Sequence, residues 1–366
     1  MRAGVWSMTA AVVVVSACGG TGERTTTEAP VGNVGERPAA APAAARPTGP
    51  LLYVTNERAG TVTIIDAQAL EVVTTVTLGK RPRGIAVSPD RSRVFVALSG
   101  SPIAGPGVDE KTLPPPDRGA DGIGVVDTAS HKLVQVLRAG SDPESVALSK
   151  DGTRAFIANE DTAQASVVEL ADGRVSNSYK VGEEPEGIAV TPDGKQLWVT
   201  SEDAGAVYVI DLQAQKVVTS IEVGPRPRSI AFLPDGSRGY IPAENGSTVA
   251  VVDAASLRLI KKIPLGEGMR PMGTAMAPDG KTLYVTTGRS KMVLLVDTAA
   301  DQVVGSVEAG PRPWGVAVSS DGKTVYTANG PSNDVSVIDA TSRQVTKKIA
   351  VGDGPWGLAL VERPPL

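Results

Sequence analysis

The sequence predicts an all-β fold, a seven-bladed β-propeller in which four-stranded blades form a closed ring. Three observations carry this prediction: a unit that repeats with a period in the low forties, short strand-like runs within each unit, and Asp-Gly turns between them. The clearest marker of the unit is a proline, with spacings of 61, 42, 42, 44, 42 and 42 residues, at Pro82, Pro143, Pro185, Pro227, Pro271, Pro313 and Pro355. Repeats of this length bury their faces only by stacking on neighbours, and seven units fit a closed ring.

Each repeat contains four runs rich in Val, Ile and Tyr and bounded by Gly, Pro and Asp, a pattern typical of strands. We designate them A to D from the centre of the ring outwards. In the third repeat they are residues 185–190, 197–201, 206–211 and 216–222. A blade of four strands is therefore expected from every unit.

The turns between the strands are also predicted from local chemistry. Strand A connects to strand B through Pro-Asp-Gly at 192–194, 234–236 and 278–280, and Gly supplies the positive φ of a tight hairpin at little steric cost. An acidic residue such as Asp211 precedes each turn from strand C to strand D. We interpret it as a side chain that caps backbone N–H groups of the turn rather than as a metal ligand.

The two ends of the repeat pattern predict how the ring closes. The pattern opens at a strand B, residues 51–55, and finishes with a lone strand A, residues 355–361. One blade should therefore combine one C-terminal strand with three N-terminal strands. Such a closure pairs the strand edges that would otherwise stay open.

The segment before the repeats has a different composition. Residues 1–18 resemble a bacterial lipoprotein signal peptide, with an apolar stretch too short to span a bilayer and the lipobox-like run Val15-Ser16-Ala17-Cys18-Gly19. Cys18 is the only cysteine in the chain, and we expect it to be the lipidation site, although an accidental cysteine is the alternative. Residues 19–50, rich in Ala, Pro and Thr, are expected to form a flexible linker to a propeller at 51–366.

These features predict an extracytoplasmic protein that contacts a bacterial membrane through its lipid anchor only. Gly19 differs from the Asp-type signal for retention in the inner membrane, so in a Gram-negative cell the outer membrane, facing the periplasm, is favoured. The formal net charge is −4 and no basic cluster is present, which argues against a nucleic-acid partner. We expect a monomer.

Catalysis has little support in the sequence. The only histidine, His131, falls in a predicted turn from strand C to strand D, so a Ser-His-Asp triad or a histidine metal site cannot be assembled. We predict no catalytic residues, no metal ligands and no cofactor. A site made only of carboxylates stays open as an alternative, with Glu160, Glu202 and Glu244 around Ca²⁺ or acting on a lactone.

Strand direction alternates, so the loops from D to A and from B to C share one face of the ring, which we call the top face. Residues beside the repeat prolines and in the B-to-C loops differ between blades and form a predicted polar funnel with a tryptophan platform. The candidate ligand- or partner-binding residues are Arg83, Glu144, Glu160, Glu186, Glu202, Arg228, Glu244, Arg270, Met272, Arg312, Trp314 and Trp356. The simpler interpretation, which we favour, is that these arginines and glutamates pair between blades and the tryptophans wedge the rim of the channel.

The first repeat carries an insertion, which accounts for the interval of 61 residues. Residues 99–121, between the predicted strands 94–98 and 122–127, are too rich in Pro and Gly for a helix and should emerge on the top face beside the funnel. Long loops in compact domains are functional lids or simply mobile.

Several repeat units resemble the YVTN-repeat β-propeller family. The resemblance covers residues 51–361 and is carried by such runs as Tyr53-Val54-Thr55-Asn56 and 283–286. More narrowly, residues 159–161, 185–187, 329–335 and 354–357 resemble the seven-repeat propellers associated with alcohol catabolism dependent on pyrroloquinoline quinone (PQQ).

The resemblance implies an exported seven-bladed propeller without established catalytic residues, found near periplasmic quinoprotein dehydrogenases. It marks no residue of this chain as a ligand of the quinone. Our hypothesis is a lipid-anchored binding or scaffold protein that holds a protein partner or a small ligand on its top face. The alternative is a propeller hydrolase of lactonase type that uses carboxylates of the funnel, with or without Ca²⁺.

Overall fold

The computed structural model describes residues 49–103 and 112–362. The expected signal peptide, its Cys18 and nearly all of the expected linker lie outside these residues, as does the middle of the 99–121 insertion. In the described part of the chain, no helix has the length and apolar character needed to cross a membrane.

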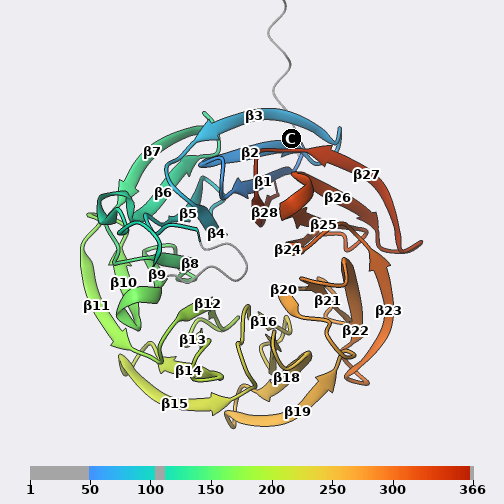
Figure 1. Ribbon diagram of the computed structural model, residues 1–366. Helices are drawn as coiled ribbons and strands as arrows, with labels where there is room; N and C mark the ends of the chain where they lie inside the picture. Colours follow the sequence, from blue (N-terminus) through green and yellow to red (C-terminus); the bar gives the residue numbers. More distant parts are fainter. Residues whose placement is uncertain (1–48, 104–111, 363–366) are drawn as a thin grey trace, which may run out of the picture. The chain divides into compact units, whose positions relative to one another are not determined.

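Seven four-stranded antiparallel sheets are arranged as blades around a common centre (Figure 1). From the centre outwards, blade 1 contains β28 (Pro355–Val361), β1 (Leu51–Asn56), β2 (Thr61–Asp66) and β3 (Glu71–Thr77), and blade 2 contains β4 (Pro82–Val87), β5 (Arg93–Leu98), β6 (Gly122–Asp127) and β7 (Lys132–Leu137). Blade 3 contains β8 (Pro143–Leu148), β9 (Arg154–Asn159), β10 (Gln164–Glu169) and β11 (Val175–Lys180), and blade 4 contains β12 (Pro185–Val190), β13 (Gln196–Ser201), β14 (Ala206–Asp211) and β15 (Lys216–Glu222). Blade 5 contains β16 (Ala231–Phe232), β17 (Arg238–Ala243), β18 (Thr248–Asp253) and β19 (Arg258–Pro264), and blade 6 contains β20 (Pro271–Met276), β21 (Thr282–Thr287), β22 (Met292–Asp297) and β23 (Gln302–Glu308). Blade 7 contains β24 (Pro313–Val318), β25 (Thr324–Asn329), β26 (Asp334–Asp339) and β27 (Gln344–Ala350). The predicted seven-bladed all-β propeller is confirmed.

Blade 1 closes the ring as the sequence predicts. Strand β28, the last of the chain, pairs antiparallel with β1, with Leu51 opposite Val361 and Tyr53 opposite Ala359. Figure 1 shows the red β28 on the inner side of the blue β1, nearest the centre of the ring. Leu358 and Leu360 of β28 pack into the apolar layer between blades 1 and 7.

The core consists of apolar layers between neighbouring blades. The second and third strands of each blade are covered on both faces and are mostly apolar, such as Leu51–Asn56 with all six residues buried. The outermost strands alternate, because one face packs inwards and the other meets solvent. Residues 216–222 of β15, for example, are mostly exposed with only Ile221 buried.

Neighbouring inner strands come so close that the position two residues after the repeat proline has no room for a side chain in most blades. A Cβ atom added to Gly357 would lie 2.6 Å from the carbonyl oxygen of Arg83 in blade 2. At Gly315 it would lie 2.5 Å from the carbonyl oxygen of Trp356 in blade 1. In blade 5 this position is Ser229, whose hydroxyl donates instead to the carbonyl oxygen of Met272 in blade 6, at 2.9 Å.

The threonine of the Tyr-Val-Thr motif joins two blades. The Oγ1 of Thr55 in blade 1 accepts a hydrogen bond from the N–H of Gly357 in its own blade (2.8 Å) and donates to the carbonyl oxygen of Arg83 in blade 2 (2.9 Å). Thr200 and Thr286 make the same pair of hydrogen bonds in blades 4 and 6. In these three blades the buried hydroxyl therefore fixes how the inner strand packs against that of the next blade.

Blade 5 has a much shorter inner strand than the others. Only Ala231 and Phe232 of β16 pair with β17, apart from an isolated bridge between Pro227 and Ala243. Pro242 of β17 accepts from the N–H of Arg228 at 3.0 Å, so its backbone faces β16. Because proline has no N–H, one bond of this ladder is missing and the inner strand is interrupted.

The predicted turns are confirmed. The Gly residues after Asp in the A-to-B turns, such as Gly194 (φ +80°), adopt positive φ. Asp211 accepts hydrogen bonds from the N–H groups of Gln213 and Ala214, and five other blades cap the C-to-D turn in the same way. In these six blades the acidic residue thus has the capping role expected from the sequence.

Candidate functional site

The top face begins where each inner strand starts, at the repeat proline. The residue before this proline is left-handed in all seven blades, with φ between +41° at Arg81 and +69° at Gly354. Glycine adopts this conformation at least cost, whereas a charged side chain there carries backbone strain. Six blades nevertheless place Arg, Asp or Glu at this position, and five of these six residues line a cavity on the top face.

A cavity of about 1020 Å³ lies on this face. Its wall contains residues beside the repeat prolines, residues of the B-to-C loops and parts of the 99–121 insertion. The predicted site residues that line it are Arg83, Glu160, Glu186, Glu202, Arg228, Arg312, Trp314 and Trp356. Glu144, Glu244 and Arg270 are not part of this wall, and Met272 lines a deeper compartment.

Arg228 of blade 5 is the centre of one buried ion network. Its guanidinium contacts Glu186 (3.1 Å) and Glu202 from blade 4 and Glu244 (2.7 Å) from its own blade. Three carboxylates thus surround one buried cation. Two further arginines complete the network: Arg226 contacts Glu202 and Glu244, and Arg270 contacts Glu244 at 3.2 Å.

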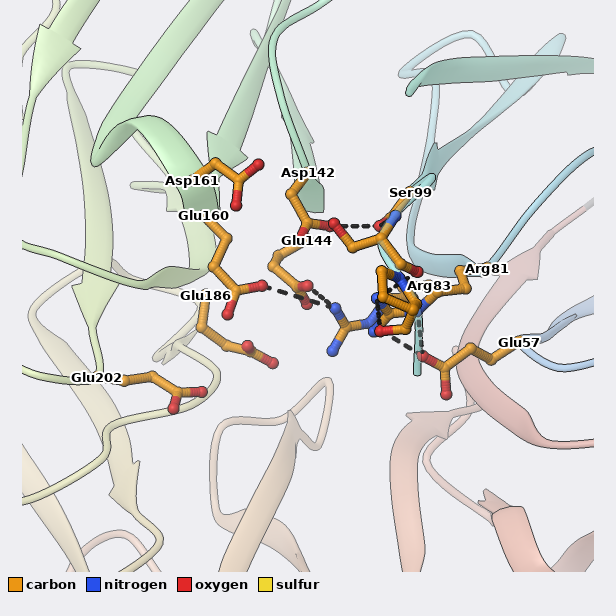
Figure 2. A network of polar contacts seen from close by, with 12 residues as sticks. Glu57, Arg81, Arg83, Ser99, Asp142, Glu144, Glu160, Asp161, Glu186 and Glu202 are labelled. Carbon is orange, nitrogen blue, oxygen red and sulfur yellow. Dashed lines mark hydrogen bonds and ion pairs between the residues drawn. The ribbon is translucent and has the colours of Figure 1, made fainter. Parts of the chain in front are cut away.

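Arg83 of blade 2 is the centre of a second network (Figure 2). It contacts Glu144, which is fully buried, and lies 4.0 Å from Glu160, both from blade 3. On its other side it lies 3.5 Å from Glu57 of blade 1, which also pairs with Arg81 at 3.1 Å. Arginine and glutamate therefore pair across three blades here, as the simpler interpretation of the sequence expects.

Two tryptophans lie between the networks. Trp314 and Trp356 stack with ring centroids 5.5 Å apart and an interplanar angle of 26°. Arg83 lies over Trp356 at 5.4 Å and Arg228 over Trp314 at 5.5 Å. These cation–π contacts link the two networks into one continuous row.

Below the tryptophans lies a smaller compartment of about 170 Å³. It is lined by backbone of the inner-strand glycines and by apolar side chains such as Ile85, Met272 and Leu358. Glu186, Arg228, Trp314 and Trp356 line both compartments. These four residues therefore form the partition between the polar upper cavity and the inner part of the channel.

Burial and neighbouring charges change the protonation of these carboxyl groups. Burial, followed by the negative charge of Glu186, raises the pKa of Glu202 to about 8, although Arg228 and Arg226 act in the opposite direction. For Glu186 itself burial is outweighed by Arg228 and Arg83, so its pKa is lowered. Near neutral pH, Glu186 is thus charged and Glu202 holds a proton.

Glu160 is the second carboxyl with a raised pKa. Burial raises the pKa of Glu160 to about 7, Arg83 opposes this, and the charges of Glu186 and Asp142 add to it. Carboxylate oxygens of Asp142, Glu144 and Glu160 lie within 4.8 Å of one another, which is close enough for a shared metal ion. The Arg83 guanidinium contacts two of these three carboxylates and so already occupies the position of a cation.

The raised pKa values predict how stability depends on pH. A carboxyl group with a raised pKa in the folded state stabilises the fold fully below its unfolded value of 4.5, and this contribution is lost as the pH rises through about 7 to 8. We expect the free energy of unfolding to fall between about pH 5 and pH 8.5 and to fall less in Glu202→Gln. Each pKa unit corresponds to about 1.4 kcal/mol, which urea unfolding at several pH values detects.

Asp193→Asn is the control for this prediction. Asp193 is exposed in an A-to-B turn and its pKa is lowered by Thr191 and the N–H of Lys195, so it titrates below this pH range. A wild-type protein whose stability rises from pH 5 to pH 8.5 would contradict the prediction.

The insertion is anchored to the site at both of its ends. Ser99 donates to Asp142, the N–H of Gly100 donates to the buried Asp121 at 2.6 Å, and Arg118 pairs with Asp161 of blade 3. These contacts hold the described ends of the insertion against the acidic side of the cavity. Described residues near both ends, among them Pro102 and Arg118, line the cavity.

Some participants were outside the set of candidate site residues. Glu57 and Arg81 belong to the Arg83 network, and Arg226 belongs to the Arg228 network. Their signal was present in the sequence, since all three flank a repeat proline or follow a strand B. Glu183, which also lines the cavity, lies one position further from the proline and had no such signal.

Residues 117–238 match the family model described as a YNCE-like beta-propeller. The chain is a β-propeller. No curated protein sequence matches it significantly.

Among solved structures, similar folds include Kuenenia stuttgartiensis Hydrazine Synthase (TM-score 0.68, 24% identity, covering 80% of this chain and 93% of that one). Another is a Bacteroides uniformis protein provisionally assigned as a 6-phosphogluconolactonase (TM-score 0.70, 17% identity, 86% and 99%). The dihydro-heme d1 dehydrogenase NirN is a third (TM-score 0.63, 17% identity, 89% and 78%). At these identities the likeness shows the fold alone.

Proposed function

We propose that this propeller is a binding or scaffold protein that holds a small ligand, or side chains of a protein partner, in the upper cavity of its top face. The observation that carries the proposal is the combination of a cavity of about 1020 Å³ with a wall whose charged groups fix one another. Arg83 and Arg228 are each held by three carboxylates and a tryptophan. Because these side chains are already held in place in the free protein, little conformational entropy is lost when a ligand binds.

The proposal includes a location. The protein is extracytoplasmic and lipid-anchored through Cys18, in the outer membrane facing the periplasm if the cell is Gram-negative. This rests on the lipobox-like residues before the single cysteine. The resemblance to the PQQ-associated propellers supports a partner or ligand from periplasmic quinoprotein alcohol catabolism.

A hydrolase of lactonase type is the second candidate. Glu160 favours it, because a carboxyl with a pKa of about 7 on a cavity wall suits a general base. The provisional assignment of the Bacteroides uniformis protein as a lactonase points the same way. Against it, the carboxylates beside Glu160 are already engaged, Asp142 with Ser99 and Glu144 with Arg83.

The tryptophan pair provides the test. We expect Trp314→Ala/Trp356→Ala to lose capture of the native ligand or partner from the membrane of the source cell, because the variant removes the partition and loosens both arginines. Quantitative mass spectrometry of the captured material is the measurement. Lys195→Ala/Lys323→Ala, on exposed turns of the opposite face, is the matched control and should capture normally.

Thermal unfolding should confirm that both variants are folded before capture is compared. Unchanged capture by the tryptophan variant would contradict binding at the top face. Hydrolysis of a lactone panel by the wild-type protein, lost in Glu160→Gln, would establish the second candidate instead.

A further inference from the structure

We propose that Arg312 is the ligand-recognition residue of the upper cavity and that the ligand carries an oxyanion, either a carboxylate or a phosphate group. This inference rests on the proposed function and specifies the chemistry of what is bound. Arg312 belongs to blade 7, beside Trp314, and it lines the cavity.

The argument begins with the pairing of the cavity arginines. Seven arginines line the cavity, and six of them are held in ion pairs with carboxylates. The six are Arg58 with Asp353, Arg81 with Glu57, Arg83 with Glu144, Arg118 with Asp161, Arg226 with Glu202, and Arg228 with Glu244. Arg312 has no carboxylate partner among the residues that the structure describes, and its guanidinium instead lies over the Trp314 ring at 5.2 Å.

The backbone makes this missing partner significant. Arg312 occupies the left-handed position before the repeat proline (φ +47°), where a charged side chain is strained. In blades 2, 5 and 6 the arginines at this position are tied to carboxylates that offset the strain: Arg81 to Glu57, Arg226 to Glu202, and Arg270 to Glu244. Arg312 lacks this compensation, so a bound anion is the partner that its position accommodates.

The surroundings of Arg312 suit an anion. The guanidinium is held against Trp314, and Arg228 lies over the same ring, so two cations flank one tryptophan. Removal from water lowers the pKa of Arg312; the more distant charges of Glu244 and Glu57 oppose this effect, and the positive charges of Arg228 and Arg226 add to it. A carboxylate or phosphate would restore the lost solvation and could accept two parallel hydrogen bonds from the planar guanidinium.

The opposite wall sets the size and polarity of the rest of the ligand. Glu160, Glu183 and Glu186 line the side of the cavity formed by blades 3 and 4. An anionic group would avoid these carboxylates and select the side of Arg312 and Trp314. A small organic anion with an uncharged body fits this division better than an inorganic ion.

The test is calorimetric titration of the full-length protein with four probes of similar shape: benzoate, phenyl phosphate, benzyl alcohol and benzylamine. We expect one or both anions to bind and the neutral and cationic probes not to bind. Arg312→Gln should weaken anion binding by about tenfold or more, which corresponds to about 1.4 kcal/mol. Arg289→Gln makes the same charge change on an exposed top-face loop outside the cavity, and it should leave the affinity unchanged.

The two anions distinguish the sources of the oxyanion. Preference for benzoate identifies a carboxylate ligand, and preference for phenyl phosphate identifies a phosphate ester. Equal affinity of wild type and Arg312→Gln, tighter binding of benzylamine, or no binding of either anion would each overturn the inference. None of these outcomes touches the proposed function, because capture by the tryptophan variant tests that separately.

Discussion

Deleting residues 355–366 is expected to prevent the propeller from folding into a closed ring. The deletion removes β28, so blade 1 loses its inner strand and β1 becomes an open edge at the centre of the ring. Leu358, Leu360 and Val361 leave the apolar layers on both sides of blade 1. Burial of such side chains contributes about 1.5–3 kcal/mol each, which is comparable in sum to the whole stability of a typical domain.

Size-exclusion chromatography and limited proteolysis measure this outcome. We expect aggregates and rapid cleavage, because an exposed strand edge pairs with other chains. A chain that ends after Glu362 keeps β28 and should behave like the wild type. Addition of a synthetic peptide of residues 355–362 should partly restore protection by adding a strand to β1. A truncated chain that stays monomeric and unfolds at the wild-type temperature would refute the closure mechanism.

Replacing Arg228 by methionine is expected to destabilise the protein by about 3–5 kcal/mol, the range seen when one partner of a buried ion pair is removed. The side chain of Arg228 is only 8% exposed, and its removal leaves Glu186, Glu202 and Glu244 close together with one fewer cation. Protonation can relieve part of the repulsion. The loss of unfolding free energy in Arg228→Met should therefore be larger at pH 8.5 than at pH 5.5.

Denaturant unfolding of Arg226→Met is the control for Arg228→Met. Arg226 contacts two of the same carboxylates, but its side chain is 43% exposed, so its loss should cost only about 0–1 kcal/mol. In a double-mutant cycle at pH 8.5, above the pKa of Glu202, Glu202→Gln should recover part of the stability lost in Arg228→Met, because it removes one of the unpaired carboxylates. Equal stability of Arg228→Met and wild type would show that the network contributes nothing to the fold.

The fold was predictable because each of its determinants is local. The apolar runs of the B and C strands, the Asp-Gly turns and the spacing of the repeat prolines are all features of single units. Closure by residues 355–361 followed from counting strands at the two ends. The shortening of β16 was also readable in principle, since Pro242 interrupts a run that otherwise indicates a strand.

The site was predictable as a set of positions and not as a set of contacts. Position in the repeat places Arg228 and Glu202 on the top face, but which blade supplies the partners of Arg228 depends on how neighbouring blades are rotated. Pairing of Arg83 with Glu57, Glu144 and Glu160 spans three blades for the same reason. The raised pKa of Glu202 and the missing partner of Arg312 depend on burial and charge balance, which no single repeat contains.

The close approach of neighbouring inner strands, two residues after the repeat proline, bears on how many blades complete the ring. A blade is a wedge, and the angle of the wedge depends on how much closer neighbouring blades lie at the axis than at the rim. Gly315 and Gly357 allow the close approach at the axis, because they place no Cβ atom against the carbonyl oxygens of Trp356 and Arg83. A larger residue at every such position would reduce the wedge angle, and more wedges would then be needed to complete a full turn. At five of the seven positions, the absence of a single carbon atom therefore helps to keep the wedge angle wide.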